Sequence, residues 1–197
     1  RSPCIRLKMR WCLRARYRVT AGVLGGPLGS QSAWACMLPL SRATSARGRY
    51  PVTQEQMISQ HVQAHGWHCL NVFANDDEDP FSYSIGFWAS YEAPEVLVFG
   101  LPDEQAHALL SACHQHLKGG GSIVPDVESD GILAGGYKVV FKAVREDQFP
   151  EYLGTAMRYY EDRPFPALVM FLPDREHRFA WDEGYAGPSV REALAIV

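Results

Sequence analysis

The chain has 197 residues, of which 19 are Lys or Arg and 22 are Asp or Glu, and its formal net charge is −3. Residues 1–49 contain ten Lys or Arg and no acidic residue, which leaves nine basic against 22 acidic residues, a net charge of about −13, in residues 50–197. So acidic a domain is not expected to bind nucleic acid unaided. The longest apolar stretch is far shorter than the ~20 residues of a membrane span, so no membrane partner is expected either.

Residues 1–49 are predicted to be a basic, poorly structured leader, because Gly and Pro interrupt their scattered apolar pairs. Three interpretations are open: an organelle transit peptide, a basic arm for nucleic acid or acidic surfaces, or upstream sequence translated through a misplaced start. We favour the third, because residue 1 is Arg and because Trp11, Trp34 and three cysteines are unusual in a functional disordered arm.

The first half of residues 50–197 predicts a helix, a hairpin, a strand and a second helix. Thr53 and Gln56 have the spacing of a capping box and Gly66 is a natural stop, which predicts a helix over residues 54–65. Residues 67–74 and 81–87 are expected to form a hairpin around a polar turn at 75–80. Residues 95–101 are almost all apolar, as in a central strand covered on both faces, and a helix follows from Pro102 to the glycines at 119–121.

The second half adds a strand at 137–144, an amphipathic helix at 149–160, a strand at 167–172 and a turn returning as a strand through 178–181. Helices and strands do not alternate strictly along the chain. We therefore expect residues 50–197 to form a single acidic α+β domain, with a mostly antiparallel sheet and about three helices.

Cysteine usage favours a reducing compartment. Cys4, Cys12 and Cys36 lie in the leader, and only Cys69 and Cys113 lie in the domain, without CxxC spacing. Both domain cysteines fall within apolar patterns, so we expect them to be small buried hydrophobic residues.

Three histidines offer a possible metal site. His61, His65 and His68 have helical spacing, and Asp76, Asp77 and Glu78 could approach them across the hairpin, a ligand set that suits zinc or iron. The spacing is not HExxH, and we favour surface and capping roles, with no metal and no cofactor. Nucleophilic catalysis has little support, because the chain has no GxSxG elbow and no phosphate-binding glycine loop.

Aromatic residues give the clearer signal for binding. Several lie near the ends of predicted elements, and aromatic side chains together with Arg are common anchors of binding surfaces. Plain core packing is the alternative. The candidate binding cleft consists of His65, Trp67, Tyr83, Ser84, Gly86, Tyr152, Arg158, Asp174, Arg175 and Trp181.

Several blocks of sequence stand out in order: HGW at 65–67, FSYSIGF at 81–87, APEVLVFGL at 93–101, YLGTA at 152–156, FPA at 165–167, LPDR at 172–175 and FAW at 179–181. Over residues 51–185 they resemble the bacterial family "domain of unknown function 4262". Members often carry Gln and Trp at positions that are Val169 and Leu172 here, and Pro where Ala180 precedes Trp181. If that Gln and Trp line a site, the site is altered in this chain. The resemblance implies a cytoplasmic bacterial domain and no particular reaction.

The sequence leaves the catalytic residues, and whether the protein is an enzyme, open. The leading interpretation is a small soluble cytoplasmic binding or interaction domain, accessory or immunity-like, with a protein or small-molecule partner. The alternative is a hydrolase or metal-dependent enzyme that uses His65 or His68 with Asp76 or Asp77.

Overall fold

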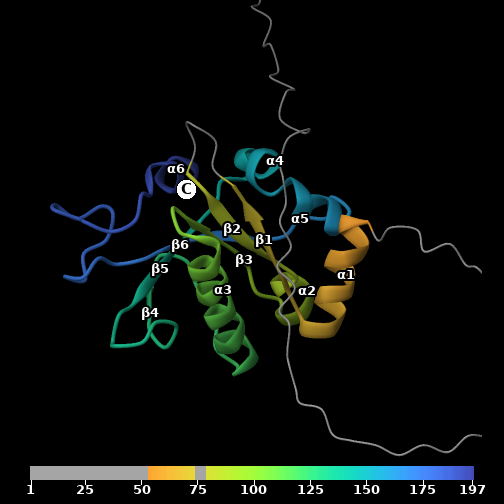
Figure 1. Ribbon diagram of the computed structural model, residues 1–197, viewed down its shortest axis with the longest axis horizontal. Coiled ribbons are helices and arrows are strands. Elements are labelled where there is room, and N and C mark those ends of the chain that lie inside the picture. Colours follow the sequence, from red (N-terminus) through yellow and green to blue (C-terminus); the bar gives the residue numbers. More distant parts are fainter. Residues whose placement is uncertain (1–52, 74–78) are drawn as a thin grey trace, which may run out of the picture.

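The computed structural model describes residues 53–73 and 79–197. The predicted leader and the hairpin turn with Asp76, Asp77 and Glu78 lie outside the described residues. The elements are α1 (Gln54–His65), β1 (His68–Val72), β2 (Phe81–Ile85), α2 (Phe87–Tyr91), β3 (Glu95–Phe99), α3 (Asp103–Lys118), β4 (Glu128–Ser129), β5 (Val139–Ala143), a 3-10 turn η1 (Glu146–Gln148), α4 (Phe149–Tyr152), α5 (Gly154–Tyr159), β6 (Ala167–Phe171) and α6 (Arg191–Ile196) (Figure 1).

The strands form one sheet in the order β1-β2-β3-β6-β5-β4. The β3–β6 pair is parallel and the other pairs are antiparallel, which confirms the predicted α+β class with a mostly antiparallel sheet. Every residue of β3 is buried, so the prediction of a central strand covered on both faces is also confirmed.

Helices cover both faces of the sheet (Figure 1). One face packs against α3, through residues such as Leu110 and Cys113. The other face packs against α1, α5 and α6, and on it the alternating residues Leu97 and Phe99 of β3 lie in one cluster with Val140 of β5. This second face holds both charged side chains on which the functional argument depends.

Helix α1 has the predicted limits. Thr53 Oγ1 accepts a hydrogen bond from the backbone N–H of Gln56, the Gln56 side chain accepts one from the N–H of Thr53, and Gly66 ends the helix with φ 86°. None of the helices in the described part of the chain has the length and apolarity needed to cross a bilayer.

Two predictions of secondary structure were wrong, and two short helices were not predicted. The single helix at 149–160 is divided into α4 and α5 at Leu153, which is fully buried with φ −118°. No strand forms at 178–181, because the backbone of Arg178 bonds back to Asp174 and closes a turn. Helices α2 and α6 were not predicted, since five and six residues are too few to show a helical period.

Candidate functional site

A buried carboxyl group lies at the start of β3. Glu95 is 0% exposed, and its Oε1 accepts hydrogen bonds from the backbone N–H groups of Gly86 at 2.9 Å and Trp88 at 3.2 Å, and from the hydroxyl of Tyr160. Its Oε2 accepts a hydrogen bond of 2.5 Å from Ser84 Oγ. The carboxyl group thus joins the end of β2, the start of α2 and the residue that follows α5.

The local sequence explains this arrangement. Gly86 has φ 113°, and a Cβ at this position would lie 2.9 Å from the side chain of Val62 in α1. Only glycine therefore lets the backbone turn against α1 and direct its N–H toward the carboxyl group. Ser84 Oγ also accepts a hydrogen bond of 2.9 Å from the N–H of Val96, which fixes the hydroxyl in place.

Burial is the main electrostatic influence on this cluster. It raises the pKa of Glu95, against the opposing effect of the hydrogen bonds from Ser84 and Tyr160. Burial and the neighbouring carboxyl group likewise raise the pKa of Tyr160. Ser84 is 0% exposed and Tyr160 5%, and every buried side-chain polar atom in the described residues has a partner. The cluster is closed to substrate and ties four segments of the fold together.

The structure brings together two of the three histidines from the predicted metal set. The Nδ1 atoms of His61 and His68 lie 2.9 Å apart, and the rings of His61 and His65 are 6.2 Å apart in an edge-on arrangement. Burial, with smaller contributions from His61 and His107, lowers the pKa of His68 to about 4. Among the described residues, no group of three or more His, Cys, Asp or Glu side chains could hold a metal ion.

Trp67 packs in the core between the sheet and α3. Its ring is 5.4 Å from that of Phe87 and 5.6 Å from those of His107 and His114, and it is 8% exposed. The hydroxyl of Tyr91 lies 2.8 Å from Nε2 of His114, and so completes this aromatic cluster.

Tyr83 and Tyr152 meet through Phe81. The Phe81 ring is 6.1 Å from that of Tyr83 and 5.4 Å from that of Tyr152, and Tyr83 is only 2% exposed. Arg158 is exposed on α5 and forms an ion pair of 3.7 Å with Glu55. Tyr83 and Tyr152 therefore belong to the core on the face covered by α1, α5 and α6, and Arg158 lies at the surface. Ser84 and Gly86 belong to the Glu95 cluster.

Asp174 organises the segment between β6 and α6. Its carboxylate accepts hydrogen bonds from the N–H groups of Glu176, Arg178 and Ala186 and from the Arg178 guanidinium, at 2.9 to 3.1 Å. Burial alone would raise the pKa of Asp174, but these hydrogen bonds hold it below its usual value. The neighbouring Arg175 is exposed, and its carbonyl accepts a hydrogen bond from Tyr137.

Trp181, in the same segment, is the candidate residue that lines a surface pocket. Its indole stacks on Phe179, with ring centres 5.1 Å apart and an angle of 12°, and meets Phe171 of the sheet edge-on at 5.5 Å. These contacts hold the indole at the sheet although it is 46% exposed.

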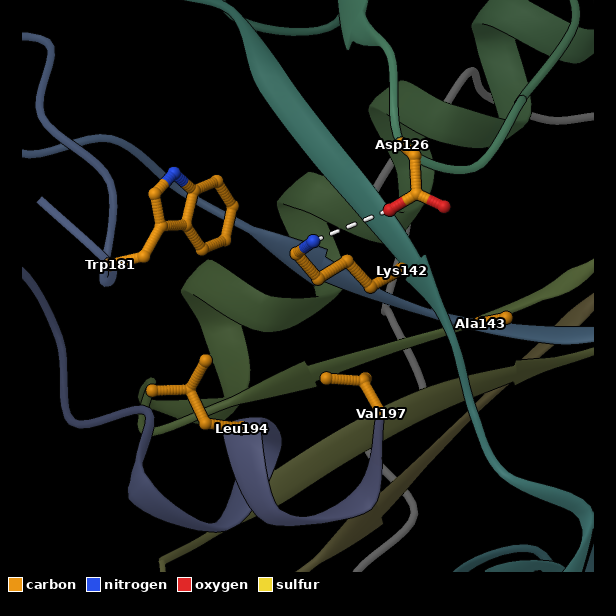
Figure 2. A pocket seen from close by; sticks show the side chains of 6 residues that line it. All are labelled: Asp126, Lys142, Ala143, Trp181, Leu194 and Val197. Carbon is orange, nitrogen blue, oxygen red and sulfur yellow. Dashed lines mark hydrogen bonds and ion pairs between the residues drawn. The ribbon is translucent and has the colours of Figure 1, made fainter.

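The pocket has a volume of about 420 Å³ and is open to solvent. Figure 2 shows Lys142 reaching from β5 into the space between Trp181 and Asp126. The Lys142 ammonium lies 4.8 Å from the centre of the Trp181 ring and 3.3 Å from Oδ1 of Asp126. The lining residues are Asp126, Lys142, Ala143, Trp181, Leu194 and Val197.

Sequence reasoning missed Glu95 and most of the pocket. Glu95 is an acidic residue at the head of the apolar run at 95–99, and Lys142 interrupts the alternation of Val140 and Val144. A charged residue at a core position is a usable signal, because it needs a partner. The short α6, with Leu194, gave no comparable sign.

Comparison with known proteins agrees with the sequence resemblance. A family model described as "Domain of unknown function (DUF4262)" matches residues 61–186, well over half of the 197 residues. The match includes Glu95, Lys142 and Trp181 and ends before α6. No curated protein and no solved structure matches the chain. The chain belongs to the DUF4262 family.

Proposed function

We propose that this protein is a small non-catalytic binding domain that recognises a protein or small-molecule partner through the pocket around Trp181. The observation that carries the proposal is an exposed indole held rigidly beside a solvent-open pocket. A volume of about 420 Å³ falls within the range of about 300–1,000 Å³ that is usual for ligand sites. A rigid aromatic side chain loses little conformational entropy on binding, which makes it an effective anchor.

Two exposed apolar side chains line the pocket. Six large apolar side chains are exposed among the described residues, and Trp181 and Leu194 are the two of these that line the pocket. Exposed apolar side chains beside a pocket are typical of a binding site.

The alternative site at the Glu95 cluster suits catalysis poorly, because the hydroxyl of Ser84 and both oxygens of Glu95 are enclosed and hydrogen-bonded.

The unpaired thiols of Cys69 and Cys113 fit a reducing compartment, and we place the protein in the cytoplasm on that ground.

NMR with small probes tests the proposal. We expect at least one of the N-acetyl amides of Leu, Trp, Arg and Glu to shift the Trp181 indole signal and the methyl signals of Leu194 and Val197. The methyl shifts should vanish in Trp181→Ala, and all the shifts should persist in Trp88→Ala, which removes an indole that is 37% exposed outside the pocket. If no probe shifts these signals at millimolar concentration, or if Trp88→Ala alone abolishes the shifts, the proposal is wrong.

A further inference from the structure

Lys142 occupies an unusual position for a lysine. It projects from the same face of β5 as Val140, which belongs to the core, and its neighbour in β6, Val169, is fully buried. Its ammonium is held by the indole face of Trp181 and by the carboxylate of Asp126. An aromatic face and a carboxylate are the two groups that proteins use to bind cations.

Both of these groups are accessible from solvent. The side chain of Asp126 is 72% exposed and Trp181 is 46% exposed, whereas the side chain of Lys142 is 32% exposed. Exposed ion pairs and exposed cation–π contacts are individually weak. A cation from another molecule can therefore displace the Lys142 ammonium at little cost.

The charge of residues 50–197 favours a cationic ligand. Residues 50–197 carry about −13, which attracts basic partners and repels acidic ones. An anion would also find the Lys142 ammonium already paired with Asp126. The apolar side chains of Leu194 and Val197 line the same pocket and offer a surface for the aliphatic stem of a long basic side chain (Figure 2).

We propose that the pocket binds an Arg or Lys side chain presented by a basic segment of a protein partner. The incoming cation stacks on Trp181 and pairs with Asp126, and Lys142, which holds that place in the free protein, moves aside. This inference rests on the proposed function and names the class of its partner.

Fluorescence anisotropy with a labelled, blocked peptide of alternating Arg and Gly, added to the full chain at low salt, tests the proposal. Asp126→Asn and Trp181→Ala should each weaken binding about threefold to tenfold. Lys142→Met should strengthen binding by a similar factor, because it removes the competing ammonium. The matched controls are Glu104→Gln and Lys118→Met, which make the same charge changes on exposed positions of α3.

Equal effects of Asp126→Asn and Glu104→Gln would show attraction to overall charge alone and would overturn the proposal. Weaker binding by Lys142→Met would overturn it too, because Lys142 would then be a ligand-binding group. If the Leu, Trp or Glu amide shifts the Trp181 signal and the Arg amide and peptide do not, this inference fails while the binding function stands. If none of these probes acts at the pocket, both fail.

Discussion

Glu95 and Lys142 are residues with ionisable side chains on the same face of one sheet, and they differ in burial and in the number of their hydrogen-bond partners. Glu95 is fully enclosed, and its two oxygens accept four hydrogen bonds. Lys142 lies in β5 near the edge of the sheet, partly open, with one exposed carboxylate and one exposed indole. The enclosed carboxyl group connects segments of the fold and has no route to a ligand. The open charge contributes little to the fold, and its contacts are available for exchange.

The largest expected effect is the loss of the Glu95 side chain. Glu95→Ala leaves the N–H group of Trp88 and the hydroxyls of Ser84 and Tyr160 without the carboxyl acceptor, and leaves the N–H of Gly86 only the hydroxyl of Tyr160 at 3.1 Å. It should lower the free energy of unfolding by about 3–5 kcal/mol. Glu95→Gln should cost less than about 1.5 kcal/mol, because its amide oxygen can accept the same three bonds and its NH₂ can donate to Ser84. Urea denaturation measures both values.

The pH dependence provides a second test at Glu95. Because burial raises the pKa of Glu95 above its ordinary value of 4.5, the folded state keeps a proton that the unfolded state releases. This contribution to stability is lost as pH rises from about 4.5 through the folded pKa. Glu95→Gln should therefore gain stability relative to wild type as pH rises from 4 to 8. A constant difference across this range would show that Glu95 titrates normally.

The next effect concerns His68, at the same end of the sheet as Glu95. Its folded pKa of about 4 lies below the ordinary value of 6.5, so the unfolded state takes up a proton first as pH falls. Its contribution, on the order of 2 kcal/mol, is present above pH 6.5 and is lost between pH 6.5 and about 4. His68→Gln should reduce the pH dependence of the melting temperature between pH 6.5 and about 4.

A smaller effect is expected at Asp174, which positions the segment that carries Trp181. In Asp174→Asn an NH₂ group replaces one of the two acceptor oxygens. It then faces either the backbone N–H groups of Glu176 and Arg178 or the Arg178 guanidinium and the N–H of Ala186. We expect the Tm to fall by about 2–4 °C and the Trp181 indole signal to move. An unchanged indole signal would show that Phe179 and Phe171 alone fix the pocket.

Lys142→Met should have a still smaller effect on stability, within about 1 kcal/mol, because a surface ion pair and an exposed cation–π contact contribute little. Urea denaturation of Lys142→Met and Glu95→Ala under the same conditions compares the loss of unfolding free energy at the two positions directly. A loss of 3 kcal/mol or more would remove the distinction between the enclosed and the open charge.

The smallest effect is expected from removing residues 1–51, since both charged positions lie within residues 53–197. We propose that the domain begins between Arg49 and Thr53, so a chain that starts at Val52 should melt within about 2 °C of the full chain. A much lower Tm in calorimetry would show that the first 51 residues are part of the folded unit.

The sequence predicts most clearly what neighbouring residues determine. The capping residues of α1 and the apolar run of β3 are local signals, and both elements are found where expected. Contacts between distant segments have no such signal: Glu95 and Tyr160 are 65 positions apart, and Lys142 meets Trp181 only because β5 and the segment after β6 are adjacent in the fold. Trp181 was therefore foreseen as a candidate, while the residues around it were not.

Fluorine NMR of the protein labelled with 5-fluorotryptophan tests the central claim most directly. The chain has five tryptophans, of which Trp181 lies at the pocket while Trp67 and Trp88 lie toward the Glu95 end. Titration with the Arg-Gly peptide should shift the Trp181 signal in a saturable way and leave those of Trp67 and Trp88 in place. A saturable shift of Trp67 or Trp88 with Trp181 unmoved would contradict the account and transfer the binding site to the Glu95 end.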